Sequence, residues 1–290
     1  MAAAALQLRT GLAYRAVVTI AELLDVLWRD YTASAPQAEH IRYLLAARGE
    51  ILSNDHVALC SYGAAGIDAQ ALARPFEALG WRRRAQCEFL GPHLRAWTWQ
   101  HDDDALPRVL IGEIAIDELS PAAQAVIGRM IGELPPGFGD RDDLPWAGRP
   151  WRVTVAEYQA LLAESEHAAW LAAFGFRVHH FTIDVGALST FPDLEALDAF
   201  LIEHGFQLDD RGGAIKGSAA EWIEQSVMRA DRVAVELGDA VVRIPSGGYQ
   251  LVRRYRLPSG ELFPGVAPAS AGAVFASVFA SVFASAGTGG

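Results

Sequence analysis

Two short apolar segments that carry histidine constrain the fold of this chain more than any other feature. Residues 51–63 (ILSNDHVALCSYG) run from a helix-ending Gly49 to a turn-like Gly63, and residues 176–186 (FRVHHFTIDVG) follow a helical segment. Apolar runs of this length between turn residues are typical of buried strands. A helix and further strands follow each of them, so the two halves share one order of elements although their sequences do not align.

The rest of the chain alternates between helical and strand patterns. We predict two helices within 16–48 with a break at 34–36, and a hairpin of 81–90 with 94–101 whose turn holds Gly91 and Pro92. Ser120 and Pro121 fit the start of a helix. The other expected helices are 69–79, 120–134, 155–174 and 193–205, and the other expected strands are 107–116, 214–218, 232–237, 241–245 and 249–257.

This order predicts a single catalytic-type domain over residues 1–290. Its parts are N-terminal helices (1–48), a first α/β half (49–134), a linker rich in Pro, Gly and Asp (135–150), a second α/β half (151–270) and a tail (271–290). The tail repeats VFAS over 274–285, which we interpret as a terminal helix that docks on the body; partner binding and a repeat of genetic origin are the alternatives.

Composition excludes several classes of function. The net charge of −11 repels phosphate backbones, and the 24 Lys and Arg residues are scattered, so no nucleic-acid partner is expected. Two cysteines do not make a disulfide framework, and neither a secretory signal nor a membrane span is evident. We predict a reduced, cytoplasmic protein without a membrane partner.

The histidines of the two apolar segments are the best candidates for chemistry. Metal sites for oxygen chemistry use two imidazoles and one carboxylate, and strands hold such groups rigidly on one face. His56 with one of His179 and His180 would supply the imidazoles. Taken alone, each is more often a hydrogen-bonded core histidine than a metal ligand, so the residues themselves leave both interpretations open and favour the core.

Other polar residues are weaker candidates. His101 begins a polar turn, His167 lies in a helix, and His204 lies at a helix end, where a contact with the helix dipole would suffice. Glu113 fits either a ligand or a satisfied buried acid. The segment around Lys216 lacks the spacing of a phosphate-binding loop.

Eight ordered segments resemble the 2-oxoadipate dioxygenase/decarboxylase family, also called 2-hydroxyglutarate synthases, over about residues 20–277. These segments are NDHVAL, ARPFEALGW, the strand before DELSPAAQ, GRPW with AEYQALLAESEHAAW, GFRVHHFTI, GGAIKGSAAEWIEQS, IPSGGYQLVRRY and GELFPGVAPASA. The resemblance implies an α+β fold related to the vicinal oxygen chelate class, with a curled mixed sheet and flanking helices around non-haem iron(II). It also implies that a 2-oxo acid and dioxygen give a 2-hydroxy acid one carbon shorter and carbon dioxide, as in 2-oxoadipate to 2-hydroxyglutarate in lysine catabolism.

The same resemblance assigns the metal ligands. The first family histidine, in its Asn-Asp-His motif, falls on His56, and the second falls on His180, with His179 where the family usually has Asn. The third ligand is a glutamate in the family, but the matching position here is Gln250. A neutral amide oxygen supplies no negative charge, so we expect weaker binding of a divalent ion.

Substrate-binding positions follow in the same way. The family commonly has arginine, a clamp for a substrate carboxylate, where this chain has Cys60. On an extended strand, Cys60 lies roughly 13 Å beyond His56 on the same face. The other expected contacts are Lys216, Ser218, Gln225, Ser226 and Arg253; Arg253 and Arg254 are candidates to replace the missing clamp, with a solvated strand edge as the alternative.

Two hypotheses on function follow. The first is an active iron(II) oxygenase of this family, retuned to another 2-oxo acid. The second is a catalytically impaired relative that serves as a binding or assembly module, which the changes at Gln250 and Cys60 motivate. A homo-oligomer is compatible with either.

Overall fold

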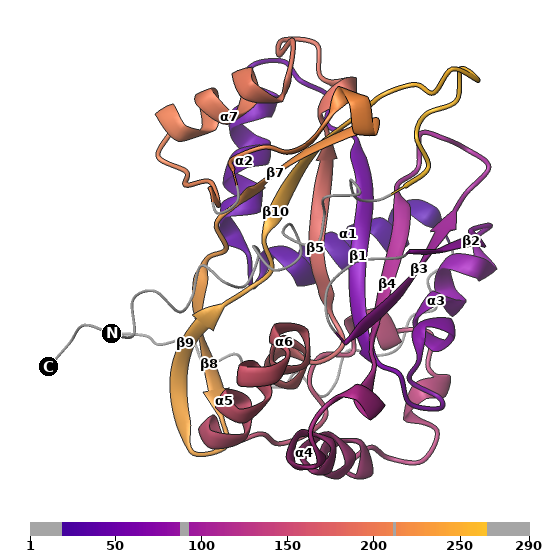
Figure 1. The fold of residues 1–290 in the computed structure, drawn as a ribbon, viewed down its shortest axis with the longest axis vertical. Helices are drawn as coiled ribbons and strands as arrows, with labels where there is room; N and C mark the ends of the chain where they lie inside the picture. The colour runs from indigo at the N-terminus through magenta and orange to yellow at the C-terminus, as the bar shows by residue number, and fades with distance from the viewer. Residues whose placement is uncertain (1–18, 88–92, 211–212, 266–290) are drawn as a thin grey trace, which may run out of the picture.

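The computed structural model describes residues 19–87, 93–210 and 213–265, and one curled, mixed β-sheet dominates this part of the chain (Figure 1). Its eight strands lie in the order β2-β3-β4-β1-β5-β10-β7-β6, and a separate ribbon pairs β8 with β9. The strands are β1 (Asn54–Tyr62), β2 (Arg82–Cys87), β3 (Leu94–Gln100), β4 (Arg108–Ile114), β5 (Val178–Asp184), β6 (Lys216–Ser218), β7 (Ile223–Met228), β8 (Arg232–Leu237), β9 (Ala240–Pro245) and β10 (Tyr249–Arg254).

Seven α-helices of the described residues flank this sheet. They are α1 (Ile20–Thr32), α2 (Pro36–Ala47), α3 (Ala69–Ala78), α4 (Pro121–Gly132), α5 (Val155–Glu164), α6 (Glu166–Phe174) and α7 (Leu194–Glu203). Thr19, Asp68, Ser120, Thr154, Ser165 and Asp193 cap the N-termini of six of them by accepting backbone N–H donors. The predicted α+β class with a curled mixed sheet and flanking helices is confirmed.

The two histidine-bearing strands pair with each other at the centre of the sheet. β1 and β5 are antiparallel, and each has a parallel neighbour from its own half, β4 beside β1 and β10 beside β5. Strands covered on both faces read as continuous apolar runs, which is why the two segments looked alike in sequence. The join between the halves therefore places both histidine segments side by side (Figure 1).

Irregularities in the β1–β5 ladder change which side chains share a face. The register shifts between Asn54 and His56, and again between Ala58 and Leu59, where Ala58 is paired with His180 and Leu59 with Val178. An extra residue in a strand breaks the strict alternation of side chains. Consecutive polar side chains are thus brought into contact. Asp55 contacts His56 in β1, and His179 contacts His180 in β5.

One face of the sheet packs on α1 through an aromatic cluster. Trp28 and Tyr31 of α1 pack against Phe181 of β5 and Tyr249 of β10, with ring centroids 5.1 to 6.4 Å apart. The Tyr31 hydroxyl donates to the Gly248 carbonyl at 2.6 Å. This contact ties the first helix to the start of β10, more than 200 residues along the chain.

The loop before β10 also passes close to the histidine strand. A Cβ at Gly247 would lie 1.8 Å from the carbonyl oxygen of His179, so only glycine fits there. The Gly-Gly pair that ends the loop therefore lets β10 approach β5 closely.

One expected helix and one unexpected strand separate the prediction from the structure. The single helix expected over 155–174 is two helices, because Ser165 is extended and caps α6. Strand β7 was missed, since its sequence IEQSVM places polar residues on both faces. The Gly91-Pro92 turn and the tail repeat lie outside the described residues.

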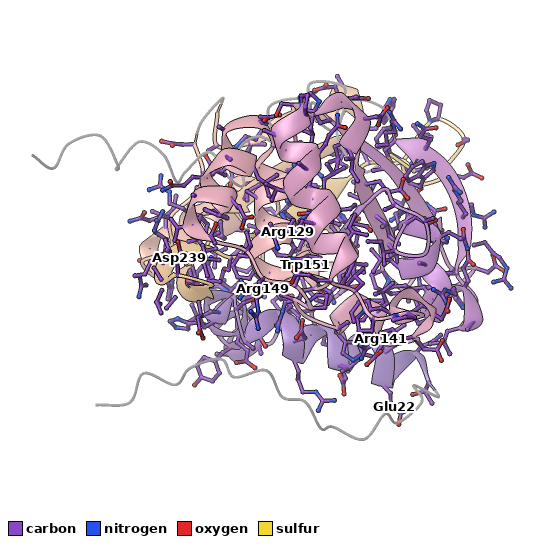
Figure 2. All side chains as sticks on the ribbon, turned by 90° about the horizontal axis from the view of Figure 1, so that it is seen from below. Glu22, Arg129, Arg141, Arg149, Trp151 and Asp239 are labelled. Atoms are coloured by element: carbon purple, nitrogen blue, oxygen red, sulfur yellow. The ribbon has the colours of Figure 1, made fainter. Side chains whose placement is uncertain are left out.

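Residues 135–150, expected as a linker, form two short 3₁₀ turns and contact several elements (Figure 2). Arg149 donates to the carbonyls of Ala173 at 3.0 Å and Glu236 at 2.5 Å. The Trp151 indole donates to the Ala172 carbonyl at 2.9 Å. The segment thus joins α6 to the β8–β9 ribbon.

Replacing Tyr31 by Phe tests the contact between α1 and β10. Tyr31→Phe leaves the buried Gly248 carbonyl without its donor, so we expect a loss of about 1 to 3 kcal/mol in the free energy of unfolding, measured by urea denaturation. Tyr43 is 72% exposed, so Tyr43→Phe is the matched control and should leave the urea midpoint unchanged. Equal midpoints for both variants would contradict the assignment.

Candidate functional site

His56 of β1 and His180 of β5 come together on one face of the sheet. Their Nε2 atoms are 3.4 Å apart, and both side chains are almost fully buried. The Thr182 hydroxyl lies 3.1 Å from the His56 Nε2. Two imidazole nitrogens and one hydroxyl therefore converge on a single point between the central strands.

The distance between the His56 and His180 Nε2 atoms suits two ligands of one metal ion. Two imidazole nitrogens bound to one divalent ion at about 2.1 Å stand roughly 3.0 to 3.4 Å apart, depending on the coordination angle. The observed separation fits that range. Among the described residues, however, no group of three or more His, Cys, Asp or Glu side chains is arranged to hold a metal. Two donors fit a metal ion, and the third must come from an uncharged group.

Gln250 is placed where it can be that third donor. It is directly paired with Thr182, which is directly paired with His56, so the three residues form one row across β10, β5 and β1. Side chains of directly paired residues point to the same face of a sheet. Gln250 is 2% exposed and therefore faces the interior beside the two histidines.

A buried carboxylate, Asp55, fixes the orientation of His56. Its Oδ2 lies 2.7 Å from the His56 Nδ1, so the carboxylate keeps a proton on Nδ1 and leaves Nε2 with its lone pair toward His180. Arg254 of β10 binds both carboxylate oxygens of Asp55, and Arg108 of β4 lies 3.7 Å from Oδ1. Asp55 thereby joins three strands of the site.

Charges of both signs meet in this network. Arg254 and Arg108 share Asp55, Asp184 also acts on both guanidinium groups, and the Arg108 Nε is buried without a hydrogen-bond partner among the described residues. Burial and the neighbouring Arg254 lower the pKa of Arg108. Although burial raises the pKa of Asp55, Arg254 and His56 outweigh it and hold that pKa well below its usual range. The histidine end of the site therefore carries buried charges of both signs.

The imidazoles of the site are neutral. Burial lowers the pKa of His56, and it lowers the pKa of His180 well below the ordinary histidine value, with His179 and His56 adding to the effect. Neutral imidazole is the form that binds metal.

Two further histidines extend the cluster toward α6. The Nδ1 atoms of His179 and His180 are 2.7 Å apart, and the His179 ring stacks on that of His167 with centroids 5.8 Å apart. Burial lowers the pKa of His167 to about 4. The residues alone left His179 and His180 as alternatives, and the family resemblance assigned His180; the structure places His180 against His56 and His179 against α6.

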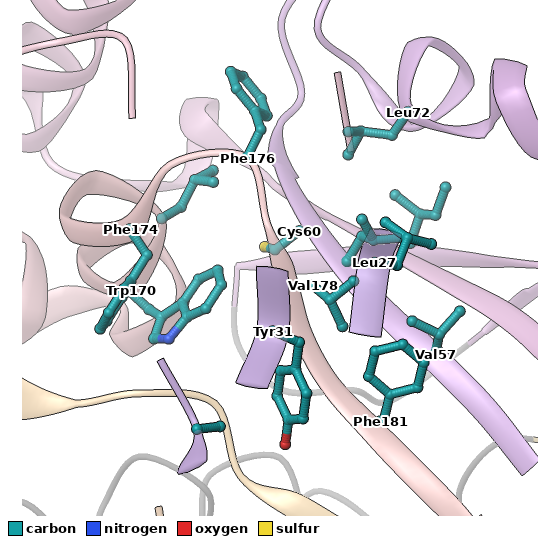
Figure 3. Close-up of a cluster of buried hydrophobic side chains, with 14 of the residues drawn as sticks. Leu27, Tyr31, Val57, Cys60, Leu72, Trp170, Phe174, Phe176, Val178 and Phe181 are labelled. Atoms are coloured by element: carbon teal, nitrogen blue, oxygen red, sulfur yellow. The ribbon is translucent and has the colours of Figure 1, made fainter. Parts of the chain in front are cut away.

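Beside His180 lies a small cavity of about 20 Å³. Strands β1, β3 and β4 form most of its wall, and α6 closes it; its lining residues are Ala58, Leu59, Cys60, Leu94, Ala96, Leu110, Gly112, His167, His179 and His180. Figure 3 shows the Cys60 sulfur turned to the side of Trp170 and Phe174, away from Val57 and Phe181. Burial raises the pKa of the Cys60 thiol to about 12, so the thiol is neutral.

The other residues expected at the substrate divide between the two faces of the sheet. By their pairing, Lys216, Ser218 and Gln225 lie on the face of Gln250. Lys216 donates to the Asp209 carbonyl at 2.8 Å, and Ser218 donates to Glu221 at 3.2 Å.

Ser226 and Arg253 lie on the opposite face. The Ser226 hydroxyl donates to Asp198 of α7 at 2.7 Å, and Arg253 donates to the Pro192 carbonyl. The structure thus does not bring these two side chains to the histidines. Both precede or follow a site-facing residue by one position, and the alternation of a strand turns them away.

The sequence did not single out Asp55, Arg108 or Thr182. Asp55 immediately precedes His56, and in a regular strand it would face the other way; only the shift in register brings it to the imidazole. Arg254 was considered as a substrate clamp, but its guanidinium is committed to Asp55. The signal that the sequence offered for Asp55 and Arg108 was a charged residue next to an apolar run.

The weaker candidates take structural roles. His204 caps α7, with Nδ1 2.8 Å from the Phe200 carbonyl, as expected for a helix end. Glu113 accepts the Ala69 backbone N–H at 2.6 Å, which makes it a satisfied acid at the start of α3. His101 lies in the polar turn after β3.

No helix in the described ranges has the length and apolar character needed to cross a membrane. The predicted cytoplasmic location stays a prediction, because the two curated relatives below are described as chloroplastic.

Comparison with known proteins finds relatives along most of the chain, although no protein-family model matches it. A 2-oxoadipate dioxygenase/decarboxylase of Oryza sativa subsp. japonica is 28% identical over 249 residues, which are 81% of this chain and 68% of that protein. The one from Arabidopsis thaliana is 29% identical over 232 residues, 73% of this chain. The chain spans only 62% of the Arabidopsis protein's length.

Solved structures agree with this result. A Shewanella frigidimarina protein, provisionally described as a hydrolase, is 36% identical with a TM-score of 0.83, covering 89% of this chain and 100% of its own. Hydroxyglutarate synthase of Oryza sativa in complex with 2-oxoadipate is 26% identical with a TM-score of 0.83, covering 90% and 92%. A Ralstonia eutropha protein provisionally placed in the glyoxalase superfamily, 20% identical with a TM-score of 0.69 and 85% of each chain covered, shares the fold.

Replacing Asp55 by Asn tests the buried network. Asp55→Asn removes the buried carboxylate that Arg254 and Arg108 share, so we expect a loss of about 3 kcal/mol in the free energy of unfolding at pH 7. Because the folded state depresses the pKa of Asp55, its contribution is present above about pH 4, the unfolded value, and is lost as the pH falls below it. The stability difference between the two proteins should therefore shrink from pH 7 to pH 3.

The exposed pair of Asp117 with Arg95 provides the control. Asp117→Asn should change the urea midpoint little at either pH. A difference for Asp55→Asn that stays constant between pH 7 and pH 3 would contradict the ionised network.

Proposed function

The chain is a member of the 2-oxoadipate dioxygenase/decarboxylase family, and from this premise we propose that it is an iron(II)-dependent dioxygenase and decarboxylase of a 2-oxo acid. The observation that carries the proposal is the convergence of the His56 and His180 Nε2 atoms at 3.4 Å, inside a buried site. In the proposed reaction, a 2-oxo acid and one dioxygen give a 2-hydroxy acid one carbon shorter and one carbon dioxide. Atoms and electrons balance without a further reductant, because the substrate supplies all the electrons.

His56, His180 and Gln250 would hold the ion. Iron(II), when bound, supplies a chelation site for the 2-oxo acid and the activation of dioxygen. Gln250 would contribute its amide oxygen, which leaves the protein donor set without negative charge. The substrate carboxylate then supplies the neutralising charge, so metal and substrate binding should reinforce each other.

The remaining residues prepare the site. Asp55 holds the His56 tautomer that presents Nε2 to the metal. Arg254 and Arg108 keep Asp55 ionised, so that it stays an acceptor for the His56 Nδ1–H. The apolar wall from Ala58 to Leu110 excludes water from the reacting groups.

The second candidate function is a binding or assembly module that has lost catalysis. Gln250 favours it, because the described residues contain no three-residue His, Cys, Asp or Glu cluster for a metal. Iron content and oxygen uptake separate the two. Protein that retains iron(II) and consumes oxygen with a 2-oxo acid is an enzyme, whereas protein that does neither is the module.

Replacing Gln250 by Glu tests the placement of the metal. Gln250→Glu adds a carboxylate to the two imidazoles, so we expect the affinity for iron(II), measured anaerobically by equilibrium dialysis, to rise at least tenfold. Gln86→Glu adds the same charge at an exposed position of β2 and should leave the affinity unchanged. Unchanged affinity in Gln250→Glu would show that Gln250 does not face the ion.

Replacing His56 by Ala is a second test of where the iron(II) ion binds. It removes one of two imidazole donors, so iron should fall to the level of protein that lacks the site. Retention of stoichiometric iron by His56→Ala would overturn it.

A further inference from the structure

The polarity of the site changes along β1 and β4, which run parallel. At one level, His56 is paired with Arg108, and the surrounding charged groups are Arg108, Arg254, Asp55 and Asp184. Two residues further, Ala58 is paired with Leu110, and two residues beyond that, Cys60 is paired with Gly112. Each step of two residues is about 6.6 Å, so the charged and apolar ends are about 13 Å apart.

The apolar end is the cavity beside His180. None of its ten lining residues is Asp, Glu, Lys or Arg. Ala58, Ala96 and Leu110 form a small buried cluster against it, with Leu94 and Cys87 at its margin. Among the residues that the structure describes, no Lys or Arg lines this cavity to receive a second carboxylate.

The nearby cations on this face are committed elsewhere. Arg254 binds Asp55 and the carbonyls of Phe263 and Gly265, and Lys216 donates to the Asp209 carbonyl. Arg108 lies on the His56 side, at the charged end. A single anionic group is therefore accommodated at the histidines, and an uncharged group is accommodated at Cys60.

We propose that the substrate is a 2-oxo acid with one carboxylate and a short apolar tail, in place of a dicarboxylic 2-oxo acid, with the tail lying against Ala58, Cys60 and Leu110. This proposal rests on the proposed function, because it takes the 2-oxo acid head to bind at His56 and His180. The small volume of the cavity limits the tail to a few carbons.

The free energy of burial in this cavity strongly favours an uncharged tail over a charged one. A carboxylate buried without a partner loses its hydration and gains no counter-charge, whereas a methyl group gains from leaving water. The product is then a monocarboxylic 2-hydroxy acid. The C3 carbon of the substrate takes the hydroxyl group, the carboxyl carbon leaves as carbon dioxide, and one dioxygen supplies the two oxygen atoms that are added.

The test compares two ligands of the same tail shape. In 5-methyl-2-oxohexanoate an isopropyl group replaces the distal carboxylate of 2-oxoglutarate. Binding of both to the full chain loaded with zinc(II), which prevents turnover, is measured by titration calorimetry, with 2-oxobutyrate and 2-oxoadipate as shorter and longer probes. We expect the isostere and 2-oxobutyrate to bind at least tenfold more tightly than either dicarboxylate.

Replacing Cys60 by Arg should shift the binding preference toward 2-oxo acids that carry a second carboxylate. Cys60→Arg places a guanidinium at the apolar end, so it should bind 2-oxoglutarate or 2-oxoadipate at least tenfold more tightly than the native chain does. Val241→Arg adds the same charge at a 68% exposed position of β9 and should change neither. The comparison within the native chain does not depend on the folding of either variant.

The outcomes separate this inference from the function it rests on. Tighter binding of the dicarboxylates by the native chain would overturn the apolar tail and leave the proposed function standing. Retention of zinc(II) without binding of any 2-oxo acid, or failure to retain it, would overturn the proposed function, and the inference with it.

Discussion

The shared carboxylate of Asp55 is the interaction on which the site depends. One buried side chain binds the His56 imidazole on β1, the Arg254 guanidinium on β10 and, more distantly, Arg108 on β4. Removing a charge from water is costly, and this cost is met only because three partners surround Asp55. The position of the first histidine is thus set by strands from both halves of the chain.

The central strands and their histidines were predictable from the sequence. Two apolar runs of strand length, each with an embedded histidine, indicated buried strands, and the family resemblance, which the comparisons confirm, selected His56 and His180. The family resemblance also implied the α+β class with a curled mixed sheet, which the structure confirms. Periodicity also located α1, α2, α3, α4 and α7 closely, because each buries a set of apolar residues at helical spacing.

The remaining features depend on contacts that no local pattern carries. The sequence did not predict that Asp55 and His56 would share a side, since that depends on a register shift between distant strands. Ser226 and Arg253 were grouped with their neighbours, but side-chain alternation directs them to α7 and Pro192. The break at Ser165 required the cap geometry of α6, and β7 required its partners β10 and β6 to be recognised as a strand.

Arg254 also binds the segment that follows β10. Besides Asp55, its guanidinium donates to the carbonyls of Phe263 and Gly265. The same guanidinium group therefore binds both the ionised carboxylate behind His56 and the backbone of residues 263–265. Cleavage of the chain just after β10 would leave guanidinium donors of Arg254 unpaired inside the protein. Because Arg254 also binds Asp55, this change would disturb the tautomer of His56, some 200 positions earlier in the chain. An intact segment 263–265 is therefore a condition for the geometry of the site on β1.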